Sequence, residues 1–554
     1  DNYPNSKSDL FSMFIERNLD LVLNHGAVAM ITMQSWMFLS SYEKLRSRLL
    51  DKNTILSMAH LGARAFDSIG GEVVQTTAFV LENSHKPDYK GGYLRLVDGK
   101  SETEKEMMIR EVTKSPDCNW FFRSSASDFK KIPGSPIAYW VSKQVRNVFC
   151  DGIPLKKIGD TRQGMATSDN NRFLRVWPEV NFNNVYFYAK TKEEAVKSGK
   201  KWFPYNKGGD FRKWYGNSEF IVNWENDGQE LLNYASSLYG SPTRTIKSIS
   251  EYFKPCVSWS KISSGDLAMR FYPTGYLFDV AGCSIFSPSN VDLMFILAYS
   301  NTLIVKKLLA SISPTLNYEA GQIASLPILN LDREKFSEIS KELIDIAAHD
   351  WNTYETTWDF QSNPLIVSQI SNSVTLQQTH ENIGLRNKSA NPTYLLAMAY
   401  ADLYARNSAN ILQMQQLEEE NNRIFIEAYG LQDELTPDVP LKEITLTCNP
   451  HYRYGDKKSE EELEALLLAD TIKEFISYAV GCMFGRYSLD KPGLILANQG
   501  ETIVDYFQQI PESTFPADAD NVIPLLDGDW FTDDISERFF QFLKVTFGDV
   551  HYQE

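Results

Sequence analysis

Long apolar runs, cysteine pairs and histidine clusters are all missing from this sequence. No apolar stretch reaches the roughly 18–20 residues that a membrane helix needs, and no signal peptide opens the chain. The six cysteines lie far apart without a CxxC pair, and the seven histidines are scattered. These absences argue against a membrane protein and against a zinc site. They predict reduced thiols in a bacterial cytoplasm.

The chain also lacks an overall positive charge. Its formal net charge is −16, which ordinarily argues against a nucleic-acid partner. The charge is unevenly distributed, however, because residues 151–220 hold 13 Lys and Arg against 8 Asp and Glu. Residues 511–554 hold 2 against 10. The average therefore conceals a basic middle and an acidic tail.

A chain of 554 residues is long enough for three or so domains, at the usual size of about 100–200 residues each. A hydrophobic content of 43% is ample for large cores. The first residue is Asp1 and a helix signal follows almost at once, so we expect a fragment of a longer protein. Composition divides the chain into an α/β part (1–95), a polar boundary (96–135), a β-rich module (136–330), a helical part (331–430) and an acidic C-terminal part (431–554).

The first ninety residues alternate between helix and strand signals. Ser8 and Asp9 offer an N-cap, apolar residues recur at helical spacing, and Gly26 ends the predicted helix. AVAMITM (27–33) predicts a fully buried strand, a helix follows over 40–50, and strands are expected at 54–60 and 73–81. This order is typical of the closing half of a doubly wound, Rossmann-like sheet. Two or three strands cannot bury both faces, so an upstream half is expected.

Residues 136–330 are rich in glycine, aromatic residues and short alternating runs, which predicts an irregular, mostly β module. Its blocks 158–177, 202–216, 257–265 and 270–286 place glycines beside Arg, Lys, Asn and Thr. Such a mixture lets a backbone approach a partner closely while side chains reach phosphates or base edges. The alternative interpretation is a β-rich domain with an aromatic core and solvated lysines.

Helices dominate after residue 331. Leu412, Leu417 and Ile424 form an apolar stripe with Glu418–Glu420 between them, which predicts a long amphipathic helix used for packing. A further helix is expected over 459–480, and the remainder is aromatic and acidic.

Several motifs resemble a known family. Asp9-Leu10-Phe11 with Phe14-Ile15-Glu16-Arg17, followed by Gly26, Ile31 and Trp36, is similar to the later motifs of gamma-class N6-adenine DNA methyltransferases. Farther on, GMATSDNNRFLRVW, WFPYNKGGDFRKWYG, DWNTYETTWDF (350–360, expected as helix) and VGCMFGRYSLDKPGL resemble the methyltransferases of BREX phage-exclusion systems, which are related to fused restriction-modification methylases. This resemblance covers essentially the whole chain.

The sequence departs from that family in two places. The Gly-rich turn for S-adenosylmethionine and the N-P-P-Y loop for the adenine amino group do not occur. Asn449-Pro450-His451-Tyr452 follows the apolar run 444–448 and is the nearest candidate, but the helix-strand order that should follow it stands at residues 9–81 instead. No PD-(D/E)xK nuclease pattern is present in context. We therefore expect this chain to be unable to methylate by itself.

The resemblance implies a base-flipping mechanism that uses S-adenosylmethionine in the parent enzyme, with Phe66 stacking on the flipped adenine. It also implies that 136–330 is the target recognition domain. The residues predicted to contact DNA are Arg162, Thr167, Asn170, Asn171, Arg172, Arg175, Lys207, Arg212, Lys213 and Lys261.

The implied partners are double-stranded DNA, the upstream methyltransferase half, and other phage-exclusion proteins or phage inhibitors that mimic DNA. Two alternatives stay open. One is a non-catalytic scaffold or regulatory subunit of a defence complex. The other is the methylase-specificity part of a fused restriction-modification enzyme.

Overall fold

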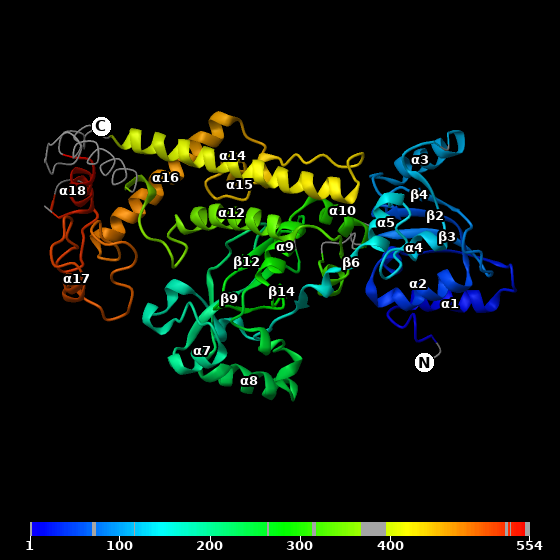
Figure 1. Cartoon of the computed structure of the whole chain (residues 1–554), viewed down its shortest axis with the longest axis horizontal. Coiled ribbons are helices and arrows are strands. Elements are labelled where there is room, and N and C mark those ends of the chain that lie inside the picture. Colours follow the sequence, from blue (N-terminus) through cyan, green and yellow to red (C-terminus); the bar gives the residue numbers. More distant parts are fainter. Residues whose placement is uncertain are drawn as a thin grey trace.

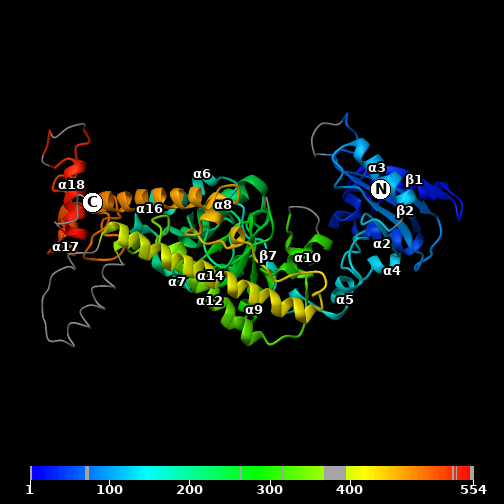
Figure 2. The same ribbon diagram turned by 90° about the horizontal axis from the view of Figure 1, so that it is seen from above.

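In the computed structural model, the described residues are 3–68, 74–115, 117–262, 265–312, 317–366, 395–526, 530–531 and 533–548. The first domain lies at one end of an elongated molecule, the module of residues 136–330 in the middle, and the end of the C-terminal part at the other end (Figures 1 and 2). Among the described residues, no single helix is long and apolar enough to cross a membrane. One pair, α9 (Asn290–Ser300) and α10 (Leu303–Ile312), passes that test only together and is bent by 75°.

The first domain is built on a five-stranded mixed sheet with the strand order β1-β3-β2-β4-β5. β3 runs antiparallel to both β1 and β2, whereas β4 is parallel to β2. Its elements are α1 (Leu10–Leu21), β1 (Ala27–Met33), α2 (Glu43–Lys52), β2 (Thr54–Gly62), β3 (Thr76–Glu82), β4 (Gly91–Arg95), α3 (Glu102–Lys114), β5 (Phe121–Ser124) and α4 (Ala126–Phe129).

The residues expected to form a boundary, 96–135, belong to this domain. β5 pairs antiparallel with β4 and completes the sheet, and α3 lies between the two strands in sequence. The predicted strands are present as β1, β2 and β3, although Val73 lies outside the described residues.

The helices α1 and α2 cover one face of this sheet, whereas on the opposite face Val112 of α3 lines an open hollow. Ile15 of α1 and Leu49 of α2 pack with Val28, Met58 and Phe79 in one core. The opposite face forms a hollow of about 510 Å³, whose apolar lining includes Ala29, Ile31, Ala59, Ala78, Val80 and Leu94. β1 is an edge strand with alternating exposure, so the prediction of a fully buried strand over 27–33 is wrong.

The module of residues 136–330 contains two four-stranded sheets, ordered β13-β9-β10-β8 and β12-β11-β14-β7, and a two-stranded pairing of β6 with β15. It carries more helix than expected. Its elements besides α9 and α10 are α5 (Lys143–Asp151), β6 (Ile153–Pro154), β7 (Asp160–Arg162), α6 (Asn170–Phe173), β8 (Leu174–Val176), α7 (Lys192–Ser198), β9 (Trp202–Asn206), β10 (Phe220–Asn223), α8 (Glu225–Tyr239), the 3₁₀ turn η6 (Pro242–Arg244), β11 (Cys256–Ser260), β12 (Met269–Tyr272), β13 (Leu277–Phe278), β14 (Gly282–Phe286), α11 (Ala320–Ala324) and β15 (Pro327–Ile328).

The C-terminal part is helical, with α12 (Arg333–Asn352), α14 (Leu396–Tyr429), α15 (Pro450–Tyr454), α16 (Glu460–Met483), α17 (Ile503–Gln509) and α18 (Ile535–Phe547). α12 and α14 share a core with the second sheet of the module and with α9, and both run alongside the module (Figure 1). α12 ends at Asn352, so the motif at 350–360 is not the expected helix.

Two residues of the predicted apolar stripe of α14, Leu417 and Ile424, are partly buried and pack against the core. Leu412 is exposed, and Met414, Glu418, Asn421, Phe425 and Tyr429 are buried instead. Glu418, Asn421 and the neighbouring Asn422 bring polar groups into this interface, so the apolar stripe in the sequence identified only part of the packed face.

Candidate functional site

The carboxyl ends of β1, β2 and β4 meet at one edge of the first sheet, because all three strands run in the same direction. Gln34 directly follows β1, His60 lies near the end of β2, and Arg95 ends β4. The buried ammonium of Lys105 donates to the carbonyls of Leu61 and Leu96, each at 2.7 Å, and so joins the ends of β2 and β4. Polar side chains from three strands and α3 are therefore held together at the carboxyl ends of β1, β2 and β4.

His60 is buried at this edge and is neutral. Burial, with the nearby charges of Arg95 and Lys105, lowers the pKa of His60 to about 3. Its Nε2 lies 2.7 Å from Gln34 Oε1, which can only accept, so Nε2 carries the proton. Nδ1 then accepts from the Tyr139 hydroxyl at 3.0 Å.

Aromatic rings pack at the same edge and connect it to the module of residues 136–330. The Trp140 ring stacks on His60 with centroids 6.1 Å apart, and the Arg95 guanidinium lies 5.9 Å from the Trp140 ring. Tyr139 stacks on Tyr93 at 4.9 Å. Since Trp140 packs against the cores of both the first domain and the module, this segment is where the two meet.

Phe66 lies in the loop after β2, close to this edge, and is 37% exposed. The next residue holds the loop in place. Asp67 N donates to Glu102 Oε1 at 2.6 Å, and Glu102 N donates to Asp67 Oδ1 at 3.2 Å, at the start of α3. Phe66 is thus an accessible aromatic side chain next to an anchored backbone.

The sequence predicted a role for Phe66, which stays a prediction, and gave no role to Gln34, His60, Arg95 or Trp140. The available signal was position, because each of the first three stands at or just beyond the carboxyl end of a strand, where open α/β sheets bind ligands.

The predicted DNA-contacting cations on the surface of the module are paired with carboxylates or carbonyls. Arg175 donates to the carbonyls of Asn171 and Leu174, both at 2.6 Å. The ion pairs are Arg162–Asp160 (2.5 Å), Arg172–Glu230 (2.7 Å), Lys207–Asp279 (2.7 Å) and Lys261–Glu319 (3.1 Å).

Hydrogen bonds join the loops that carry two of these cations, Lys207 and Lys261. Ser260 Oγ donates to the carbonyl of Gly209 at 2.7 Å, and Lys261 N donates to that of Ala281 at 2.8 Å, which joins the loops that carry Lys207 and Lys261. Thr167 is buried and donates to Asn170 Oδ1 at 2.6 Å, so it shapes its loop. Arg172 and Arg175 belong to α6 and β8 at an edge of the other sheet, near Asn170 and Asn171.

The glycine of GMATSDN serves close packing inside the protein. A Cβ added at Gly164 would lie 1.8 Å from the carbonyl oxygen of Phe278. Glycine is therefore required at this position because the backbone of Phe278 approaches it closely, and contact with a ligand is not needed to explain it.

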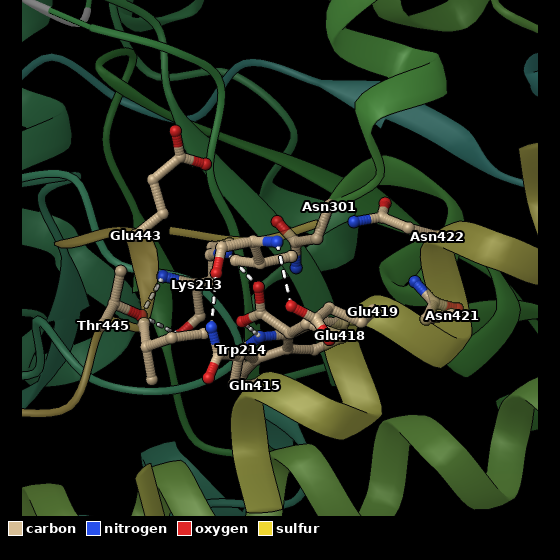
Figure 3. Close-up of polar contacts among 12 residues, drawn as sticks. Lys213, Trp214, Asn301, Gln415, Glu418, Glu419, Asn421, Asn422, Glu443 and Thr445 are labelled. Carbon is tan, nitrogen blue, oxygen red and sulfur yellow. Dashed lines mark hydrogen bonds and ion pairs between the residues drawn. The ribbon is translucent and has the colours of Figure 1, made fainter. Parts of the chain in front are cut away.

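Arg212 and Lys213 are in the interior, each only 4% exposed, which corrects their expected place on a DNA-binding surface. Figure 3 shows Lys213 beside Glu418 and Thr445. The Lys213 ammonium pairs with the buried Glu418 carboxylate of α14, and Trp214 Nε1 donates to Glu418 Oε1 at 2.7 Å. Lys213 N donates to Thr445 Oγ1 at 3.0 Å. These hydrogen bonds fix the loop after β9 to the C-terminal part.

Arg212 forms a second internal clamp. Its guanidinium lies 3.5 Å from Asp350 and sits between the rings of Trp351 (4.9 Å) and Tyr452 (5.6 Å). Asp350 also accepts from the backbone N–H of Thr447 at 2.6 Å and of Cys448 at 2.9 Å. Neither cation is available to a phosphate in this arrangement.

Asn449 of the N-P-H-Y segment is fully buried. Its amide nitrogen donates to the carbonyls of Leu441 (2.7 Å) and Ile444 (2.8 Å), and its oxygen accepts from His451 N at the start of α15. Both amide hydrogens are used, so the Asn449 side chain has no free donor for a substrate.

The chain thus consists of an α/β domain with a polar carboxyl edge, followed by a larger second module. A family model described as the Eco57I restriction-modification methylase matches residues 1–66.

Two curated relatives match the chain along its whole length. The adenine-specific methyltransferase PglX of Lacticaseibacillus casei (strain Zhang) is 38% identical over 555 residues, and the adenine-specific methyltransferase BrxX of Escherichia coli O9:H4 (strain HS) is 38% identical over 557 residues. The resemblance to adenine-specific methyltransferases is thereby confirmed over 100% of the chain, which spans 42% of the length of each relative.

Solved structures give weaker likenesses. The Type IIL restriction-modification enzyme MmeI in complex with DNA has a TM-score of 0.37 and 12% identity, covering 84% of this chain and 51% of that one. The Type ISP restriction-modification enzyme LlaGI with a DNA substrate mimic has a TM-score of 0.33 and 12% identity, covering 60% and 36%. Both TM-scores are below 0.5, so neither likeness establishes a shared overall fold.

Proposed function

We propose that this chain is the DNA-recognition and partial catalytic portion of a site-specific N6-adenine DNA methyltransferase that modifies host DNA in a BREX-type phage-exclusion system. The observation that carries the proposal is an accessible Phe66 beside the carboxyl edge of the sheet, in a chain that matches adenine-specific methyltransferases throughout. Residues 136–330 act as the target recognition domain.

Phe66 forms one wall of the pocket for the flipped adenine. Stacking of a base on an aromatic ring contributes about 1–3 kcal/mol, which holds the base outside the duplex. The methyl group comes from S-adenosylmethionine, whose Gly-rich binding turn this sequence lacks. The N-P-P-Y donors are also absent, so the chain alone binds but does not methylate DNA.

The open sheet face supports an upstream partner. Ile31 is 58% exposed on the edge strand β1, and the hollow beside it is lined by apolar side chains. Exposed apolar faces and unpaired edge strands are normally covered in native proteins. We assign this face and this edge to the upstream half of the methyltransferase domain, which completes the sheet.

The stacking role is tested by Phe66→Ala in the complete methyltransferase. Loss of about 1–3 kcal/mol predicts a roughly 5- to 150-fold lower kcat/KM, and Phe66→Tyr should retain most of the activity because its ring also stacks. Phe14→Ala, which changes an exposed phenylalanine on α1, is the matched control. Methylation by Phe66→Ala at the rate of the unaltered enzyme would remove Phe66 from the pocket.

The assignment of the open sheet face and of β1 to the upstream half is tested by expressing this chain and the upstream half separately. Ile31→Asp should prevent their co-purification, and Leu23→Asp, which alters an exposed residue outside the hollow, should not. Co-purification of the Ile31→Asp variant would contradict the assignment.

DNA contacts are proposed for Arg162, Arg172, Arg175, Lys207 and Lys261, which lie at least partly exposed, and for Asn170 and Asn171 as base-reading side chains. Since most of these cations are ion-paired, DNA has to replace a carboxylate at each of those positions.

A second candidate function is a scaffold that binds other defence proteins through the acidic C-terminal part. The supporting observation is a set of strongly exposed apolar side chains there, namely Val522, Leu525, Leu526 and Trp530. Removing 431–554 would also remove Thr445, Thr447 and Tyr452 from the internal clamps, so point variants are the better test. If Leu525→Asp with Trp530→Asp leaves complex assembly intact, the scaffold function fails.

A further inference from the structure

The segment 241–250, SPTRTIKSIS, contains two cations and five hydroxyl side chains and no carboxylate. It follows α8 and begins with the 3₁₀ turn η6. Arg244 and Lys247 are exposed, as is Thr243. Arginine, lysine, serine and threonine are the side chains that most often contact the sugar-phosphate backbone of DNA.

This segment is held against the GMATSDN loop by specific hydrogen bonds. Ala166 N donates to the carbonyl of Thr245 at 2.8 Å, and Ser248 Oγ donates to that of Gln163 at 2.9 Å. Ser248 has a φ of 56°, a conformation that L-residues rarely adopt. The segment is also anchored by the Tyr252 hydroxyl, which donates to the carbonyl of Lys247 at 2.8 Å. Arg244 and Lys247 therefore stand on a fixed backbone beside the loop that carries Thr167 and Asn170.

Arg244 and Lys247 differ from the four ion-paired cations that were predicted to contact DNA. Arg162, Arg172, Lys207 and Lys261 each have a carboxylate within 3.1 Å. Within the described parts of the chain, neither Arg244 nor Lys247 lies within ion-pair distance of a carboxylate. The nearest acidic residue in sequence, Glu251, pairs with Lys254 at 3.0 Å and accepts from Ser250. The segment is thus a locally unneutralised positive surface in a chain of net charge −16.

We propose that Arg244 and Lys247, assisted by the Thr243 hydroxyl, bind the phosphodiester backbone of duplex DNA and thereby position the loop 163–170 against the base edges. This assignment rests on the proposed function of the module. The two cations supply affinity that is independent of sequence, and the adjoining Asn170 and Asn171 are placed where they can read bases.

The test uses the whole chain and a fluorescent duplex of about 30 base pairs, with the dissociation constant measured by anisotropy at several salt concentrations. Each neutralised phosphate contributes about 0.9 to the slope of log K against log salt. The double variant Arg244→Ala/Lys247→Ala should therefore have a slope that is smaller by about 2, and at about 0.1 M salt it should bind roughly tenfold more weakly for each phosphate that it no longer neutralises. Because both residues are exposed, its melting temperature should equal that of the unaltered chain.

Lys335→Ala/Lys341→Ala is the matched control, since it removes two exposed lysines from α12. It tests whether a change of two charges anywhere on the surface has the same effect. Equal slopes for the unaltered chain and Arg244→Ala/Lys247→Ala would overturn the site while leaving DNA binding by the module intact. An equal decrease of the slope in the α12 control would overturn it too. No binding by the unaltered chain would overturn both this site and the proposed function.

Discussion

Protonation of His60 should destabilise the carboxyl end of β2 and the neighbouring strands of the first sheet as the pH falls. The pKa of this imidazole is lowered from 6.5 to about 3 in the folded protein, chiefly by burial. The unfolded chain therefore binds the proton more readily than the folded chain between these two values. It follows that stability is fully present above pH 6.5 and decreases as the pH falls toward 3.

The size of the effect follows from the two pKa values. One pKa unit corresponds to about 1.36 kcal/mol, so lowering the pH from about 7 to about 5 should cost about 2 kcal/mol at this site. Protonated Nδ1 can no longer accept from Tyr139, and the new charge lies near Arg95 and Lys105. The destabilisation should therefore be local to β2 and its neighbours.

The assay is hydrogen exchange of peptides that cover residues 54–62, corrected for intrinsic rates, at about pH 7 and about pH 5. A local measurement is preferable because a chain with several cores does not unfold in one step. In the unaltered chain the opening free energy of β2 should fall by about 2 kcal/mol between the two pH values. In His60→Gln, which cannot titrate, this decrease should disappear.

His85→Gln is the control, because His85 is exposed in the same domain. Its β2 peptides should keep the pH dependence of the unaltered chain. The reasoning would be refuted by an equal pH dependence in His60→Gln and the unaltered chain.

The remaining predictions concern the internal contacts. Lys213→Ala leaves the Glu418 carboxylate buried without its cation, so it should destabilise the chain by about 3–5 kcal/mol in urea unfolding, whereas Lys213→Met with Glu418→Leu should cost much less. Equal destabilisation of the single and double variants would contradict this explanation. Gly164→Ala forces a Cβ to within 1.8 Å of the Phe278 carbonyl and should lower the melting temperature by several degrees. Its control is Gly321→Ala in α11, where a Cβ meets nothing within 4 Å, and a melting temperature unchanged in both variants would show that the backbone at Gly164 can shift.

Local signals in the sequence predicted many elements correctly. Ser459 and Glu462 form a capping box at the start of α16, as expected for a helix beginning near 459. Alternating and apolar runs predicted β2 and β3, although their place in a sheet with β4 and β5 depends on residues that the sequence presents as a polar boundary. Strand pairing is a contact between distant segments, so composition alone could not assign 96–135 to the sheet.

The sequence by itself determined the order of the first elements from α1 to β3, the place of Phe66 in the loop after β2 and the similarity to adenine-specific methyltransferases, because these depend on neighbouring residues and on motifs. Tertiary structure alone decided which cations reach the surface. Lys213 and Trp214 meet Glu418 across 205 and 204 residues, and Lys213 meets Thr445 across 232. The sequence alone predicts that a basic side chain is exposed to solvent. In the folded chain, however, α14 and the segment that follows it bury Arg212 and Lys213. The same folding leaves Arg244 and Lys247 uncovered, since no carboxylate of the described chain is folded against them.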